Sequence, residues 1–305
     1  MSQVKRFLGY LHQALWHALE HDVLGTAKGA AYSGVLMLFP ALVVITTLLA
    51  MAPEGPSLTS EIRTAFEQAL PDDSMSLLQS AMEAKRLRST QLLLSATGFS
   101  IFAGLGVMLS LMEGFRRAYR NPVGDWGFWT RRMRALLLVP IVLLPLALAT
   151  LLVVFGRQIE MWMTANANHQ LKHVVLFLWR MVRWAISMLA SMSVLGLLYH
   201  FGTKRKEHWI RVGPGAVAAT VVWFPATLAF GWYVTRIADY SMFYGSFGAG
   251  IATLVWLYIT AFSVLLGAEL NGAMYLNRQG KTVTSPVLLA GRAEEKIAEA
   301  DASRL

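Results

Sequence analysis

Six apolar stretches, each about 20 residues long, constrain this chain more than any other feature of its sequence. A helix of that length crosses the hydrocarbon core of a bilayer, which is about 30 Å thick. The stretches cover residues 30–51, 92–112, 135–155, 179–199, 213–234 and 248–270. We therefore expect an all-α, polytopic membrane protein with six transmembrane helices.

The basic residues between these stretches fall mainly into alternate gaps. The gap after the second stretch and the gap after the fourth stretch hold the densest groups, which are Arg116, Arg117, Arg120, Arg131, Arg132 and Arg134, then Lys204, Arg205, Lys206 and Arg211. Basic residues close to the ends of spans mark the cytoplasmic face of a membrane protein. The pattern predicts that both termini are cytoplasmic.

Composition narrows the classes of function. The chain has 305 residues, of which 55% are hydrophobic and 15% charged, with a net charge of +9. The basic cytoplasmic gaps account for most of this charge, so we expect anionic lipid head groups, and not nucleic acid, as its counterpart. The absence of cysteine excludes disulfides, thiol catalysis and cysteine-bound metal.

Three segments flank or interrupt the six stretches. Residues 1–29 predict a cytoplasmic amphipathic helix, which lies either on the inner membrane surface or packed under the bundle. Its histidines His12, His17 and His21 lack a carboxylate in register, so no metal site is predicted. Residues 52–91 form an outer loop with two amphipathic helical patterns, and residues 277–305 form a polar cytoplasmic tail.

Arg180 and Arg183 are the first candidate functional residues, since charged groups at membrane depth are costly. They lie three residues apart in the first turns of the fourth span, between Trp179 and Trp184. Their long side chains can reach the outer interface beside these aromatic anchors. Alternatively, two guanidinium groups on one helix face bind a phosphate or carboxylate from the outer leaflet.

Three polar residues lie near the cytoplasmic ends of spans. Glu113 closes the second span, and Glu269 and Asn271 lie near the end of the sixth, among small residues that let helices approach closely. Both acids are placed where they could pair with arginines of the cytoplasmic loops. A bond between helices is one role for Glu269, and proton or substrate coupling is the other.

Helix breakers form a third group of candidates. Pro40 lies in the middle of the first span and Pro225 in the fifth, where each removes a backbone hydrogen bond and predicts a kink. Gly245 and Gly248 lie at the outer entry to the sixth span and permit a tight turn and close packing. No catalytic constellation, cofactor motif or nucleotide-binding loop is present in the sequence, so we expect neither an enzyme nor a cofactor.

Several motifs resemble those of the BrkB/YihY family of bacterial inner-membrane proteins. They are residues 30–40 (AAYSGVLMLFP), 213–216 (GPGA) with Trp223, 244–248 (YGSFG), 254–258 (LVWLY) and 266–271 (LGAELN). With Arg131 and Arg132, the resemblance extends over about residues 25–276. Gly34 departs from the family pattern, in which a larger residue follows the tyrosine and serine, and this puts local packing in question.

The resemblance implies a six-helix inner-membrane protein of poorly defined activity, once mislabelled ribonuclease BN and linked in some members to serum resistance. It also implies transport of a lipid or envelope precursor. We therefore carry two hypotheses: the protein moves an anionic lipid or lipid-linked envelope precursor, or it is a non-transporting scaffold for envelope integrity that binds lipids or proteins. Small residues such as Gly98, Gly104 and Gly106 leave self-association open.

Overall fold

The structure is a computed structural model that describes residues 3–51, 90–122, 124, 126–142, 172–204, 208–236 and 248–279. Every regular element within these ranges is helical. The helices are α1 (Gln3–Glu20), α2 (Val23–Met51), α5 (Thr90–Ala118), α7 (Lys172–Gly202), α8 (Trp209–Arg236) and α10 (Gly248–Arg278). A further helical segment covers residues 128–142.

Five of these helices are long and apolar enough to cross a membrane. Their apolar segments are Val23–Val44, Leu93–Ala118, Ala185–Gly202, Trp209–Val234 and Gly250–Arg278, which match the first, second, fourth, fifth and sixth predicted spans. The third predicted span begins within the helical segment 128–142, and the rest of it lies outside the described residues. A polytopic helical protein is confirmed, while the sixth span and the orientation in the membrane stay predictions.

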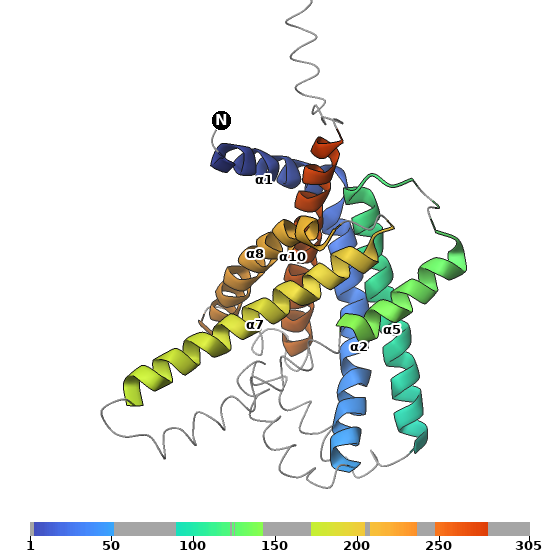
Figure 1. The fold of residues 1–305 in the computed structure, drawn as a ribbon. Coiled ribbons are helices and arrows are strands. Elements are labelled where there is room, and N and C mark those ends of the chain that lie inside the picture. Colours follow the sequence, from blue (N-terminus) through green and yellow to red (C-terminus); the bar gives the residue numbers. More distant parts are fainter. Residues whose placement is uncertain are drawn as a thin grey trace, which may run out of the picture.

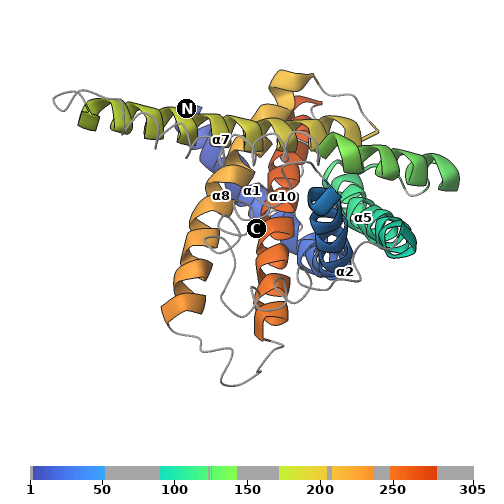
Figure 2. The same ribbon diagram turned by 90° about the horizontal axis from the view of Figure 1, so that it is seen from below.

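The helices pack around α10. Figures 1 and 2 show α2 and α5 side by side, α10 between α2 and α8, and α7 running obliquely past α8. Helix α1 lies across one end of this bundle and packs mainly against α10 (Figure 1). We call this the α1 end of the bundle. Helices α5, α7 and α10 finish near it, and α2 and α8 start there.

Helix α2 begins at Val23, well before the predicted start at Ala30. The difference arises from Asp22, which lies between α1 and α2 with a positive φ of 52°. The Gly25 N–H donates to Asp22 Oδ1 (3.1 Å), and the Thr26 hydroxyl donates to Asp22 O (3.0 Å). Asp22 is thus the N-cap of α2, and a helix begins at its cap even where the apolar stretch begins later.

The buried core is densest toward the α1 end. Phe115, Leu138, Tyr199 and Leu265 are fully buried and come from four different helical segments. Gly34, the departure from the family pattern, faces Leu257 of α10, and a Cβ added there would lie 3.2 Å from Leu257 Cδ1. The large leucine on α10 therefore fills the space that a larger residue at position 34 would need.

Helices α8 and α10 cross closely where Gly215 meets Gly267. A Cβ on Gly215 would overlap the backbone oxygen of Gly267 and the side chain of Asn271. Asn271, which is 2% exposed, donates from Nδ2 to Val212 O (3.0 Å) and accepts from the Gly215 N–H at Oδ1 (2.8 Å). Pro214 has no N–H at this point of α8, so Asn271 supplies partners to a stretch of helix backbone that proline disturbs.

Candidate functional site

Glu113, in the last turns of α5, lies at the centre of a cluster of arginines. Its Oε1 accepts from Arg116 Nη2 (2.6 Å) and Arg117 Nε (3.3 Å), and its Oε2 accepts from Arg131 Nη2 (2.9 Å). Arg116 and Arg117 are three and four residues along the same helix, and Arg131 reaches in from the segment 128–142. The expected pairing of Glu113 with arginines is confirmed. Arg117 Nη1 also lies 3.8 Å from Asp22 Oδ2, so three arginines face two carboxylates among the described side chains.

A tight turn ends α5 beside this cluster. The Asn121 N–H donates to Arg116 O (2.9 Å) and the Arg120 N–H to Arg117 O (2.9 Å), a pattern that usually has glycine in the place of Arg120. Arg120 adopts a φ of 49°, in the left-handed region, at a cost of roughly 1 kcal/mol for a residue with a Cβ. Arg116 Nη1 also donates to Asn121 O (3.0 Å), which ties the turn to the cluster.

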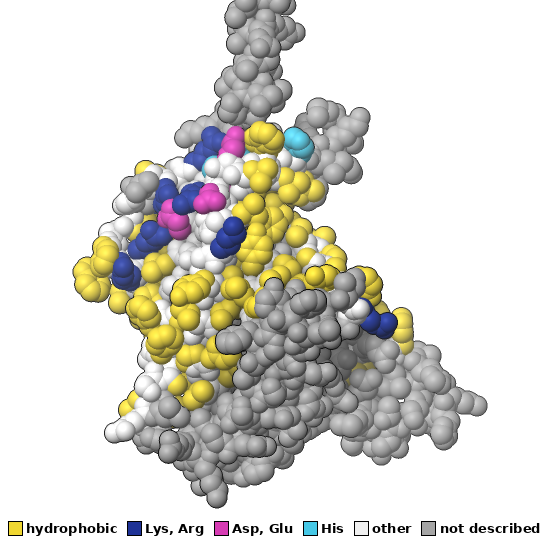
Figure 3. All heavy atoms as spheres, turned by 180° about the vertical axis from the view of Figure 1, so that it is seen from behind, with side chains coloured by type: hydrophobic (Ala, Val, Ile, Leu, Met, Phe, Trp, Pro, Cys, Tyr) yellow, Lys and Arg dark blue, Asp and Glu magenta, His cyan; other side chains and the backbone are white. Residues whose placement is uncertain are grey.

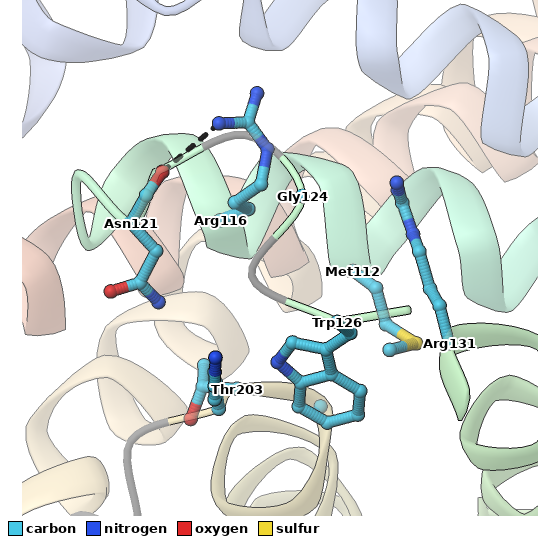
Figure 4. A pocket seen from close by; sticks show the side chains of 9 residues that line it. Met112, Arg116, Asn121, Gly124, Trp126, Arg131 and Thr203 are labelled. Carbon is cyan, nitrogen blue, oxygen red and sulfur yellow. Dashed lines mark hydrogen bonds between the residues drawn. The ribbon is translucent and has the colours of Figure 1, made fainter. Parts of the chain in front are cut away.

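A polar pocket of about 60 Å³ opens next to the turn. It is lined by Met112, Arg116, Asn121, Gly124, Trp126, Arg131, Gly202, Thr203 and Lys204. Figure 4 shows that the residues come from the end of α5, the segment after it and the end of α7. The guanidinium of Arg134 stacks on the Trp126 ring, 3.8 Å from its centre, and so holds one wall of the pocket.

Glu269 occupies a second charged site, buried between α1 and α10. Only 2% of its side chain is exposed, and His21 Nδ1 lies 2.9 Å from Oε1 and 3.0 Å from Oε2. Arg117 Nη1 donates to His21 O (3.0 Å), which links this pair to the Glu113 cluster. Within the described residues, Glu269 makes no direct bond to a loop arginine, because His21, in the turn after α1, occupies that position.

His17 packs beside this pair. Its ring stacks on His21 with centres 5.5 Å apart, and its Nδ1 lies 3.4 Å from Glu20 Oε2. Burial lowers the pKa of His17 below its usual value, and nearby Arg120 and His21 lower it further, against the effect of Glu20. In the described part of the chain, no three His, Asp or Glu side chains are arranged to hold a metal ion.

The other sequence candidates are distributed over the bundle. Helices α2 and α8 continue through Pro40 and Pro225, and the predicted kinks stay predictions. Gly248 is buried at the start of α10, while Gly245 lies outside the described residues. Most of the predicted outer loop and nearly all of the polar tail also lie outside them.

Arg180 and Arg183 both belong to α7, before its apolar segment Ala185–Gly202. Their side chains lie outside the described part of the structure. The proposed outer anion site therefore stays a prediction, and the sites described above all lie at the opposite, α1 end.

Charge and apolar surface are separated along the bundle. Figure 3 shows basic and acidic side chains gathered toward the α1 end, with hydrophobic side chains covering the middle of that face. Phe102, Leu137, Leu189, Val221 and Leu228 are each more than half exposed on span helices or on the segment 128–142. Apolar surface of this extent on long helices is typical of contact with lipid. Fold and surface thus define a polytopic α-helical membrane protein.

The chain belongs to the BrkB family, whose description is virulence factor BrkB and which matches residues 14–287. The resemblance found in the sequence motifs is thereby confirmed. No solved structure matches the chain.

Three relatives illustrate the range of the similarity. The ribonuclease-like protein YfkH of Bacillus subtilis is 30% identical over 84% of this chain and 92% of its own length. A UPF0761 membrane protein of Aromatoleum aromaticum is 24% identical over 81% of this chain and 59% of its own length. A UPF0761 membrane protein of Legionella pneumophila is 22% identical over 90% of this chain and 63% of its own length. The chain thus spans less than two thirds of these last two relatives.

Sequence reasoning missed two features of this region. The His21–Glu269 pair joins residues that are 248 positions apart, and only the cost of a lone carboxylate in an apolar helix signals that some partner exists. The pocket was missed because it needs the ends of α5 and α7 to meet, which no local pattern encodes.

Proposed function

We propose that this protein binds an anionic lipid or lipid-linked envelope precursor at the α1 end of its bundle and moves it across the inner membrane. The observation that carries the proposal is the arginine cluster, in which Glu113 pairs with Arg116, Arg117 and Arg131, and Asp22 pairs with Arg117 at 3.8 Å. A guanidinium group presents a planar fork of donors that matches phosphate oxygens. An excess of such groups at the boundary of a lipid-facing bundle suits a phosphate head group.

The aromatic residues beside the cluster support its placement at head-group depth. Phe128 and Trp129 are 62% and 71% exposed at the start of the segment that carries Arg131. The guanidinium of Arg132 lies over the Phe128 ring, 3.5 Å from its centre. Exposed aromatic side chains with neighbouring basic groups are enriched at the interface between membrane and water.

The side of the membrane follows from the distribution of basic residues. Arg116, Arg131 and Lys204 all lie at the α1 end, and basic residues at span ends favour the cytoplasmic face. In this proposal the α1 end faces the cytoplasm and receives the lipid from the inner leaflet. Arg180 and Arg183, on the outer side, would provide the second anion site.

A non-transporting scaffold is the alternative, and one observation favours it. The pocket is not lined by Glu269, which is buried and paired with His21, so the described polar pocket does not reach the acid near the end of α10. A scaffold would hold anionic lipids or envelope proteins at the same cluster without moving them.

Lipid movement in liposomes distinguishes the two functions. Purified protein is reconstituted with fluorescent anionic or zwitterionic lipids, with and without a proton gradient, and accessibility of the label is followed by quenching. Arg131→Gln is compared with Arg278→Gln, which removes the same charge from the exposed end of α10, away from the cluster. Arg183→Gln tests the outer site.

We expect the protein to move the anionic lipid. The Arg131→Gln variant should lose this movement, and the Arg278→Gln variant should retain it. Equal thermal midpoints of the variants show that the loss is not one of folding. If neither lipid moves under any condition, the transport function is refuted and the scaffold function remains.

A further inference from the structure

The pocket beside the arginine cluster is lined by Arg116, Arg131 and Lys204. We propose that it binds a single phosphate group, the chemistry that a phospholipid head group and free phosphate share. This inference deepens the proposed function, on which it rests for a lipid as the source of the phosphate. Binding itself is measured without any lipid movement.

The size of the pocket fits one phosphate. Its volume is about 60 Å³. One water molecule occupies roughly 10–15 Å³ on this measure, so the pocket holds about four to six oxygen-sized atoms. A phosphate group has four oxygens, whereas a sugar or a nucleotide base is far larger. The size therefore suits a phosphate, with the remainder of the ligand lying outside.

The charge of the pocket also fits a phosphate. Arg116, Arg131 and Lys204 bring three positive charges to its wall. Glu113 bonds to Arg116 and Arg131 and holds both guanidinium groups in place. Groups fixed before the ligand arrives lose little conformational entropy on binding it. Guanidinium and ammonium groups held in one wall favour a phosphate, whose oxygens carry its negative charge.

Neutral side chains complete the wall. In Figure 4 the indole nitrogen of Trp126 turns toward Thr203, and the Asn121 side chain lies on the same side of the pocket. No hydrogen bond joins the Trp126 indole to another described residue. Asn121 is 6% exposed. The Trp126 indole N–H and the Asn121 amide N–H groups are donors, and donors suit a phosphate because its oxygens accept hydrogen bonds.

Titration of detergent-solubilised, full-length protein tests the site. The probes are inorganic phosphate and short-chain phosphatidic acid, with short-chain phosphatidylcholine for comparison, and binding is measured by calorimetry in a phosphate-free sugar detergent. Lys204→Gln removes a pocket charge, and Trp126→Phe removes the indole N–H but keeps an aromatic ring at this position. Lys28→Gln is the matched control, since Lys28 is exposed on α2 near the same end and does not line the pocket.

We expect saturable binding, with an affinity that Lys204→Gln weakens about tenfold, as for the loss of a charged hydrogen bond, and Trp126→Phe about fivefold, as for a neutral one. The affinity of Lys28→Gln should stay within about twofold of that of the native chain. Binding of phosphatidic acid but not inorganic phosphate identifies the source as a lipid, and binding of inorganic phosphate alone identifies free phosphate. Absence of saturable binding of either, or equal weakening by Lys28→Gln, overturns the site. Binding without movement in liposomes refutes transport and leaves the phosphate site standing.

Discussion

Glu269 near the end of the last span and His21 just after the first helix lie 2.9 Å apart, in a contact that is 2% exposed on the glutamate side. This pair fixes α1 across the end of the bundle. A carboxylate in that position is stable only with a partner, because desolvation of a lone charge costs far more than a lost neutral hydrogen bond. The pair therefore predicts unequal effects for its two members.

His21→Ala should destabilise the protein by about 3 kcal/mol, since it leaves Glu269 buried without its partner. Glu269→Gln should lower the free energy of unfolding by less, roughly 1–2 kcal/mol, because the amide is neutral and still bonds to histidine. The double variant should lose less stability than the sum of the two single losses. Thermal and denaturant unfolding in detergent measure all three, with His12→Ala on the exposed side of α1 as control. Additive losses would show that the two residues are not coupled.

Arg120 provides a test of backbone strain. Arg120→Gly should raise stability by roughly 1 kcal/mol relative to Arg120→Ala, because glycine adopts the left-handed conformation of the turn without steric cost. Both variants lose the same charge, so the difference between their unfolding midpoints reports the conformation alone. Equal midpoints would mean that the turn stores no strain at this residue.

The crossing of α8 and α10 predicts opposite effects for two glycines of one helix. Gly215→Ala should cost about 2 kcal/mol or more, since the new methyl group meets the Gly267 backbone and Asn271. Gly231→Ala, later in the same helix, has open space around the new Cβ and should be neutral or stabilising by up to about 1 kcal/mol. Their unfolding midpoints in the same detergent decide the matter, and a loss of the same size at both positions would contradict the close crossing.

His17 predicts a pH dependence of stability. Its pKa in the folded protein lies below the usual 6.5, so between these two values the unfolded chain binds the proton more tightly. The stability that neutral His17 contributes is thus complete above pH 6.5 and is lost as the pH falls through the folded pKa. Glu20, His21 and Arg120 surround this ring and shape the response.

The measurement is the unfolding midpoint at about pH 7.5 and about pH 5.5, for the native chain and His17→Gln. The variant cannot titrate at this position, so its loss on acidification should be smaller. A loss that is unchanged in the variant would assign the pH dependence to other groups.

The sequence predicts the parts of this fold that depend on local pattern. Long apolar runs predict the described spans, and spacing along one helix places Arg116 and Arg117 next to Glu113. The start of α2 at Val23 was missed because a cap, and not hydropathy, sets it. Asn271 was recognised as a polar residue at a helix contact, but its bonds to the α8 backbone depend on how α8 and α10 cross. Such distant contacts follow from packing, which no single segment specifies.

The contact between α1 and α10 has a consequence for how the chain is made. Helix α1 precedes α10 in the chain, and Glu269 follows His21 by 248 residues. Until the last span has been synthesised, the first helix has no buried anchor at this point. Closure of the α1 end of the bundle by this pair is therefore a late step of assembly, and a chain that stops short of Glu269 leaves His21 without this partner.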